Sequence, residues 1–469
     1  MAEFLLRASV AALALGTLVS TTAEAEPLFG ETGFTLKNGL EVVVLPNHRA
    51  PTVAHWLWYK AGGADEERGH SGAAHFLEHL MFKGTKTMKP KEFSTLVARQ
   101  GGQENAFTSW DYTAFHQDVA ADKLELVMKL ESDRMHNLII TDDQLKPERD
   151  VVLEEWRMRI GNQPGALLDE QVEPALYLNH PYRIPVLGWT DEIKTLDVPT
   201  EKRFYDTWYA PNNAVLIVAG DVTVDQVRKL AEEYYGPIPR KAVPVRERVE
   251  EPDRSADTVV TLHHPRVRTP RWSRQYLAPS HHDHAGAEDR SYALEVLAEV
   301  LGGGANSRLH HALVLDQQIA TSAGAWYAPD RLDLTSFGIA ATPRPGVTVE
   351  QIGAAVEAVL AQMLKDGLDA DEVARAETRL VTSQLYAQDG LDEPIEVIGR
   401  VLCTGGTLAD LDAWPERIKA VTLDQVVAAA HAVFEGKPSV TALLLPADPK
   451  AVGRSPPEPD LPMQSGEIR

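Results

Sequence analysis

The chain has 469 residues, which is too long for one compact hydrophobic core, so we expect two or more domains. Its formal net charge of −22 argues against nucleic acid as a partner, because phosphate binding needs concentrated lysine and arginine. The single cysteine, Cys403, excludes an intrachain disulfide.

The first 25 residues have the composition of a secretory signal. Arg7 precedes an apolar run over residues 8–19, and Ala23-Glu24-Ala25 supplies small residues for cleavage after position 25. The run is too short and too interrupted for a membrane span, although a retained N-terminal anchor is the alternative. We therefore expect a periplasmic or secreted bacterial protein that has no membrane span after signal removal.

The segment His-Phe-Leu-Glu-His at 75–79 carries the strongest chemical signal in the sequence. Turn residues at 69–72 offer a helix N-cap, and residues 73–82 read as an apolar-rich helix that Gly84 ends. Positions i, i+3 and i+4 share one helix face, so the two imidazoles can bind one zinc ion while Glu78 reaches a water beside it. The order H-x-x-E-H is that of the inverted zincins. A buried helix whose histidines only complete hydrogen bonds is the alternative.

Residues 103–108 read as a short strand after the helix-breaking pair Gly101-Gly102. Strand propensity favours an ordinary hairpin with residues 112–119. The alternative is a strand with an unpaired edge, which can capture an extended peptide through main-chain hydrogen bonds.

A hydrolytic zinc site needs three protein ligands, and a charged helical segment at 147–157 offers the third. Glu148 and Glu155 are seven positions apart, close to two helical turns, so both carboxylates lie on one face. Glu154 is rotated by about 100° from Glu155, so only one of these adjacent carboxylates is expected to point at the metal.

With these residues the chain resembles the pitrilysin family of metallopeptidases, which includes insulin-degrading enzyme and the mitochondrial processing peptidase. In that family the third ligand is a glutamate about 76 positions after the second histidine, and 155 − 79 = 76 selects Glu155. A further important glutamate seven residues earlier corresponds to Glu148. The resemblance implies that His75, His79 and Glu155 bind Zn2+, that Glu78 is the general base, and that Glu148 is a supporting catalytic carboxylate.

The resemblance extends to residues 101–108, which are similar to the N-A-x-T strand of the family. The exposed edge of that strand pairs with substrate, so the resemblance implies that Asn105, Ala106, Phe107 and Thr108 bind peptide. The position of this strand relative to the zinc motif reverses the preference for an ordinary hairpin.

The sequence contains the same pattern twice, offset by roughly 220 residues. A helix at 198–208 and a buried strand at 214–220 recur as a helix that ends at 434 and a strand at 440–446. The remaining strands also have counterparts, with 35–45, 52–59, 103–108 and 113–119 recurring near 257–263, 272–277, 320–328 and 334–341. We expect an α+β fold of two homologous domains, each a mainly antiparallel sheet packed against helices. The resemblance implies that they form half of a clam-like chamber.

Prolines and charges alternate over 237–252 without helical or strand period, which is typical of a linker. The expected boundaries are a signal peptide at 1–25, a zinc-binding peptidase domain at 28–240, a linker at 241–255, a homologous domain without a zinc site at 256–450 and a C-terminal tail at 451–469.

The second repeat lacks the zinc motif, because Glu295, Ala298 and Glu299 stand at its three positions. The chain also differs from the family pattern in its C-terminal half. Active family members commonly have an arginine and a tyrosine there, seven residues apart, that help to fix the substrate near the metal. The matching positions here hold Val314 and Thr321, although Arg308 or Tyr327 could stand in. We therefore predict a heterodimer in which a related subunit supplies the missing pair.

The sequence thus predicts a zinc metalloendopeptidase that hydrolyses peptides or unfolded segments, with Glu78 activating a zinc-bound water, as the catalytic subunit of a two-subunit assembly. The alternative is a non-catalytic peptide-binding or assembly subunit that keeps the peptidase fold. A structural zinc site is a third reading, but such sites normally close the fourth position with cysteine or histidine.

Overall fold

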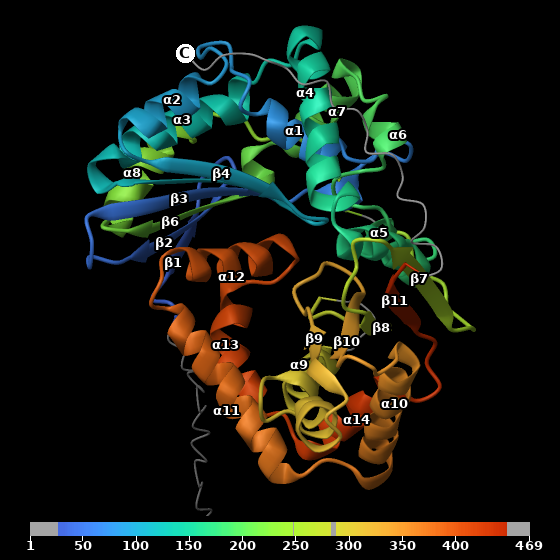
Figure 1. The fold of residues 1–469 in the computed structure, drawn as a ribbon. Coiled ribbons are helices and arrows are strands. Elements are labelled where there is room, and N and C mark those ends of the chain that lie inside the picture. The colour runs from blue at the N-terminus through green and yellow to red at the C-terminus, as the bar shows by residue number, and fades with distance from the viewer. Residues whose placement is uncertain (1–26, 247, 283–287, 448–469) are drawn as a thin grey trace, which may run out of the picture.

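The computed structural model describes residues 27–246, 248–282 and 288–447 (Figure 1). The predicted signal peptide at 1–25 and the predicted tail at 451–469 lie outside these ranges. In the part of the chain that is described, no helix is both long enough and apolar enough to cross a membrane.

The first half is built on a six-stranded sheet with the order β1-β2-β6-β3-β5-β4. The strands β2 and β6 are parallel, and every other pair is antiparallel. The strands in that order are β1 (Thr32–Thr35), β2 (Glu41–Pro46), β6 (Ala214–Gly220), β3 (Thr52–Tyr59), β5 (Thr113–Ala120) and β4 (Gln103–Thr108).

The single strand predicted near 35–45 is wrong, because β1 and β2 form a hairpin. The chain reverses where the amide of Leu36 donates to the carbonyl of Leu40 at 2.9 Å. Gly39 in this turn has a φ of +94°, a conformation that glycine adopts most readily.

The second half is built on a five-stranded sheet with the order β7-β11-β8-β10-β9, in which β7 and β11 are parallel and the other pairs antiparallel. Its strands in that order are β7 (Thr258–His264), β11 (Val440–Pro446), β8 (Arg271–Ala278), β10 (Thr335–Pro343) and β9 (Ala320–Tyr327). This order repeats that of β2-β6-β3-β5-β4 in the first sheet. The predicted α+β fold with two homologous sheets is therefore confirmed.

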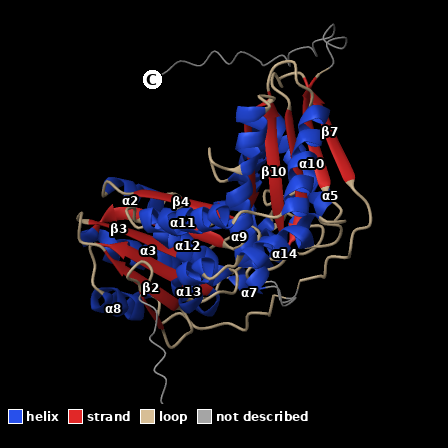
Figure 2. Ribbon diagram, turned by 90° about the horizontal axis from the view of Figure 1, so that it is seen from below, coloured by secondary structure: helices blue, strands red, loops and turns tan. Residues whose placement is uncertain are grey.

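Helices cover both sheets (Figure 2). Those of the first half are α1 (Ala73–Leu80), α2 (Glu92–Arg99), α3 (Leu124–Asn137), α4 (Asp142–Trp156), α5 (Pro164–Leu176), α6 (Thr190–Ile193), α7 (Val198–Trp208) and α8 (Val224–Tyr234). Those of the second half are α9 (Glu288–Gly302), α10 (Val349–Asp366), α11 (Ala370–Ala387), α12 (Asp392–Cys403), α13 (Leu408–Lys419) and α14 (Leu423–Phe434).

One helix of each half packs against the sheet of the other half. Leu168, Val172 and Leu176 of α5 pack against β11 in one apolar cluster. In return α12 covers the face of the first sheet that lies opposite α2 and α3 (Figure 1), where Gly399 contacts the buried indole of Trp58. The alternation of side chains along β3 makes this possible, because successive residues enter opposite cores.

Candidate metal centre

A buried carboxylate from the preceding loop caps the N-terminus of α1. Gly72 occupies the N-cap position expected within 69–72, but it has no side chain with which to accept hydrogen bonds. Glu66 accepts them instead, from the amides of Gly72 at 2.9 Å and Ala74 at 2.8 Å. These amides have no acceptor within the helix, so Glu66 fixes where α1 begins.

Helix α4 brings its glutamates to the two histidines of α1. The Nε2 atom of His75 lies 3.5 Å from Oε2 of Glu155, and Nε2 of His79 lies 3.0 Å from the same oxygen. Glu154 points elsewhere and pairs with Arg157 on the surface. Within the described ranges, His75, His79 and Glu155 form the one group of three or more residues that could hold a metal ion, and their ligand atoms all lie within 4.8 Å of one another.

The three donors fit a zinc ion. Zinc bonds of about 2.0–2.1 Å in a tetrahedral arrangement place neighbouring ligand atoms roughly 3.3 Å apart. The distances of 3.0 and 3.5 Å to Glu155 agree with that spacing. Two imidazoles and one carboxylate also leave a fourth position for water or substrate, as in catalytic zinc sites.

The two histidines differ in protonation when no metal is bound. Burial lowers the pKa of His75 to about 4, so its ring is neutral at pH 7 and offers a lone pair. Burial acts on His79 in the same direction, but hydrogen bonds to the carboxylates of Glu148 and Glu155 outweigh it and raise the pKa of His79 to about 9. A metal at Nε2 of His79 would therefore replace a proton.

A row of alternating charges holds His79 in place. Its Nδ1 lies 2.9 Å from Oε1 of Glu148, an arrangement that directs Nε2 toward Glu155. Lys83 pairs with the other oxygen of Glu148, and Nε of Arg159 lies 2.9 Å from Oε1 of Glu155. Burial alone would raise the pKa of Glu148, but His79 and Lys83 lower it. The hydrogen bond with His79 also lowers the pKa of Glu155, so both carboxylates stay ionised.

Glu78 lies beside this group and is held by β4. The hydroxyl of Thr108 donates to Oε2 of Glu78 at 2.6 Å. Burial raises the pKa of Glu78, and the hydrogen bond from Thr108 partly opposes that rise. A buried carboxylate with a raised pKa is suited to accept and return a proton.

Strand β4 forms the predicted hairpin with β5, and it also has an unpaired edge, because it is the last strand of its sheet. In the hairpin, Asn105 lies opposite His116. Asn105 is exposed, and Ala106 packs against the first core. Phe107 meets the indole of Trp58 edge-on, with ring centroids 5.3 Å apart.

The helices α9 and α11 are the counterparts of α1 and α4 in the second half, and an ion pair joins them. Oε1 of Glu299 lies 2.5 Å from Nε of Arg379. Glu295 accepts from the indole of Trp414 and lies 3.0 Å from Nε2 of His281. The glutamates that replace the histidine positions thus have cations or donors as partners.

Both possible substitutes for the arginine and tyrosine pair already have partners within the second half. Val314 packs partly against the second core, and the hydroxyl of Thr321 donates to the carbonyl of Thr342 at 3.2 Å. Arg308 pairs with Glu372 at 2.7 Å, and the hydroxyl of Tyr327 donates to a backbone carbonyl.

Sequence reasoning missed Lys83, Arg159, Thr108 as a partner of Glu78, and Glu66 as the cap. Arg159 lies four residues after Glu155, a spacing that places both on one helix face, and this was the available signal for it. Lys83 lies beyond the end of α1 at Leu80, so helical spacing gave no signal for its contact with Glu148. The acceptors of Thr108 and Glu66 depend on contacts between separate elements, which no local pattern encodes.

The sequence matches two family descriptions in succession. Residues 41–189 match "Insulinase (Peptidase family M16)", and residues 202–380 match "Peptidase M16 inactive domain". The chain therefore belongs to this family of peptidases, which is the pitrilysin family that the sequence motifs indicated.

Relatives and solved structures agree with this assignment. The Zinc protease PqqE of Helicobacter pylori is 32% identical over 349 residues, which cover 73% of this chain and 76% of that protein. An uncharacterized zinc protease of Bacillus subtilis, YmxG, is 25% identical over 86% of this chain and 95% of its own length. The crystal structure of a protease from Helicobacter pylori superposes with a TM-score of 0.81 at 28% identity, covering 89% of this chain and 99% of that one.

The periplasmic protease PqqL from Escherichia coli shares the fold, with a TM-score of 0.76 at 19% identity. The match covers 88% of this chain but only 47% of PqqL. This chain therefore corresponds in fold to about half of that protein.

Proposed function

We propose that the chain is a zinc metalloendopeptidase that hydrolyses peptides or unfolded polypeptide segments. The observation that supports this function best is the convergence of His75, His79 and Glu155 beside a buried Glu78. Zinc held by the three ligands would supply an activated water and a polarised scissile carbonyl. The zinc protease names of the relatives support the same metal.

Four side chains around the proposed zinc position have separate roles in the reaction. Glu78 accepts a proton from the attacking water and returns it to the leaving amine, which the raised pKa of this carboxyl favours. Glu148 is not a ligand in this scheme; it orients His79 through Nδ1. Lys83 and Arg159 keep the two glutamates of α4 ionised and aligned.

Substrate would bind along the outer edge of β4, in the segment from Asn105 to Thr108. A strand edge offers main-chain hydrogen bonds to an extended peptide and reads little of its sequence. Because Thr108 ends the strand and contacts Glu78, a peptide paired with β4 would run to the metal centre. This geometry favours unfolded segments over folded proteins.

We further propose a periplasmic or secreted location and a heterodimer with a related subunit. The engagement of Arg308 and Tyr327 within their own half supports a second chain as the source of the arginine and tyrosine pair. The periplasmic protease PqqL, of which this chain matches 47%, is consistent with an assembly of two such units. The proposed zinc-binding domain spans 28–240, the linker 241–255 and the second domain 256–450.

The alternative is a non-catalytic subunit that keeps the fold. Cleavage of an unstructured peptide distinguishes the two, with the zinc-loaded chain tested alone and mixed with the related subunit from the same organism. We expect cleavage that a chelator abolishes and added zinc restores. A zinc-loaded assembly that never cleaves would favour the non-catalytic subunit.

A further inference from the structure

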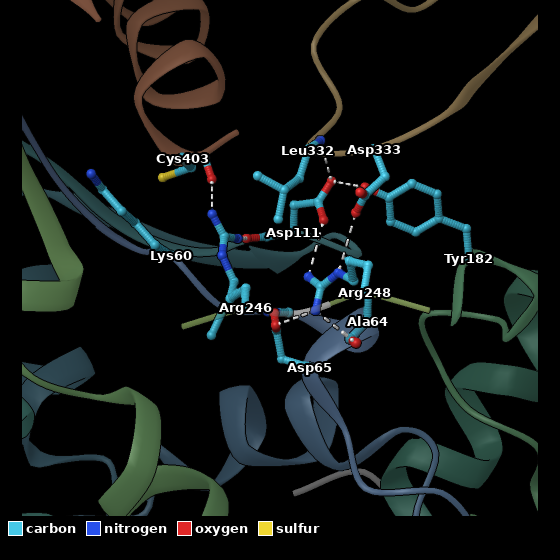
Figure 3. A network of polar contacts seen from close by, with 12 residues as sticks. Lys60, Ala64, Asp65, Asp111, Tyr182, Arg246, Arg248, Leu332, Asp333 and Cys403 are labelled. Atoms are coloured by element: carbon cyan, nitrogen blue, oxygen red, sulfur yellow. Dashed lines mark hydrogen bonds and ion pairs between the residues drawn. The ribbon is translucent and has the colours of Figure 1, made fainter. Parts of the chain in front are cut away.

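The segment that joins the two halves is held by two of its arginine side chains, Arg246 and Arg248. Residues 239–246 and 248–257 contain no helix or strand, as expected of a linker. Yet Arg246 donates to the carbonyl of Asp111 at 2.9 Å and to that of Cys403 at 2.7 Å (Figure 3). Asp111 follows β4, and Cys403 ends α12, so Arg246 ties the linker to both halves.

Arg248 contacts three carboxylates from three separate segments, which surround its guanidinium in Figure 3. Nη1 lies 2.6 Å from Oδ1 of Asp65, Nη2 lies 3.4 Å from Oδ1 of Asp111, and Nε lies 3.6 Å from Oδ2 of Asp333. Asp65 and Asp111 belong to the first half, and Asp333 belongs to the second. One side chain of the linker thus joins both halves.

The charge of Arg248 is needed where it lies. Its side chain is 7% exposed, and those of Asp65 and Asp111 are 0% and 1% exposed. Burial raises the pKa of Asp65, and the guanidinium opposes that rise. Removing the cation would deprive both buried carboxylates of their ion-pair partner in the linker and leave them only the weaker fields of Arg246 and Arg331, which is costly.

Asp65 belongs to the loop that caps α1. Its other oxygen, Oδ2, accepts from the amide of Gly62 at 2.9 Å, which closes the loop at 62–65. The next residue, Glu66, accepts from the first amides of α1. A shift of Asp65 would therefore move the cap of the helix that carries His75 and His79.

Asp111 belongs to the turn that follows β4. The amides of residues 63 and 64 donate to the carbonyls of residues 109 and 110, both at 2.9 Å, so the loop and the turn are joined. This turn begins directly after Thr108, whose hydroxyl holds Glu78. Oδ2 of Asp111 also accepts from the amide of Leu332 in the second half at 3.3 Å.

We propose that Arg248 is a positioning residue. Through it, the linker keeps the 62–66 loop and the 109–112 turn at a fixed position relative to the second half, and these two segments in turn position α1 and Glu78. Arg248 does not contact the proposed metal ligands; it acts through Asp65 and Asp111. The consequence for catalysis rests on the proposed function, whereas the restraint on the two segments does not.

The test compares Arg248→Met and Arg248→Lys with Arg240→Met, a change at an exposed arginine of the same segment. Hydrogen exchange at residues 62–66 and 109–112 should accelerate about tenfold or more in Arg248→Met, less in Arg248→Lys, and not at all in Arg240→Met. Zinc affinity, measured by competition with a chromophoric chelator, should fall in the same order. For peptide cleavage kcat should fall about tenfold while KM stays within about twofold.

The outcomes separate the inference from the proposed function. Unchanged exchange in Arg248→Met would overturn the inference, and so would faster exchange with unchanged zinc affinity and kcat. A wild-type chain that binds no zinc would overturn the proposed function, while hydrogen exchange would still decide whether Arg248 holds the two segments. If Arg248→Met does not fold, Asp333→Asn weakens the contact of Arg248 with the second half, together with the 3.4 Å contact between Asp333 and His180, and should give a smaller effect of the same sign.

Discussion

Oε1 of Glu148 and Nδ1 of His79 lie 2.9 Å apart, so this carboxylate determines which nitrogen of the ring faces Glu155. A histidine that rotated freely would present either nitrogen, or a proton, to the metal position. The contact would therefore contribute to the affinity for the proposed metal without providing a ligand.

Glu148→Gln keeps the size of the side chain and removes its charge. We expect zinc affinity to fall by about 10- to 100-fold, the range for groups that orient metal-binding histidines. Competition with a chromophoric chelator measures the change. Glu154→Gln, on the exposed face of the same helix, is the matched control, and equal affinities in the two variants would argue against the role of Glu148.

Zinc binding should release a proton from His79. The pKa of this residue is raised from 6.5 to about 9, so the metal-free ring is protonated at pH 7.5, whereas His75, with a pKa of about 4, is not. Because zinc competes with the proton, affinity should rise by about tenfold per pH unit between pH 7 and 9 and level off above. Calorimetry in buffers of different ionisation enthalpy counts the protons, and a count of zero at pH 7.5 would contradict the account.

Thr108→Val should shift the pH dependence of cleavage. The hydroxyl lowers the pKa of Glu78, so its loss raises that pKa further. Since the base must be ionised, the acidic limb of kcat/KM should move to higher pH. Thr108→Ser retains the hydroxyl and should keep the wild-type profile; a shift of equal size in both variants would exclude the hydrogen bond as the cause.

Gly399→Ala should destabilise the fold at the contact between the halves. A Cβ at this position would lie 2.2 Å from Cε2 of the buried Trp58. Overpacking of this kind costs about 1–3 kcal/mol, more than the gain in helix propensity of roughly 1 kcal/mol. Gly390→Ala, where a Cβ meets nothing within 4 Å, should stay within about 0.5 kcal/mol of the wild type in urea unfolding. Equal midpoints for the two variants would contradict the packing argument.

Much of the fold could be predicted because its signals are local. The buried strand at 214–220 and the helix at 198–208 have the predicted bounds, since an apolar run and an N-cap mark them directly. The match of the second sheet to the first followed from the repeat. The hairpin was missed although Asn38-Gly39 is a typical hairpin turn, because the segment from 35 to 45 was interpreted as one strand.

The remaining features depend on contacts between distant segments. Nothing near Arg248 in the sequence indicates that it meets Asp65 and Asp333, and the 237–252 segment has the composition of a flexible tether. The packing of α5 and α12 against the sheet of the opposite half could not be predicted either, because an apolar helix face does not specify which sheet it covers. At the candidate site the motif spacing predicted the residues that converge, but not the cations and hydroxyl that hold them.

The central claim is that Glu78 performs proton transfer at a zinc centre formed by His75, His79 and Glu155. The most direct test is cleavage of an unstructured peptide by the zinc-loaded assembly carrying Glu78→Gln, with zinc content measured in the same sample. The account predicts an unchanged zinc content and a loss of about 10²- to 10⁴-fold in kcat. Cleavage at the wild-type rate by the zinc-loaded Glu78→Gln protein would contradict it.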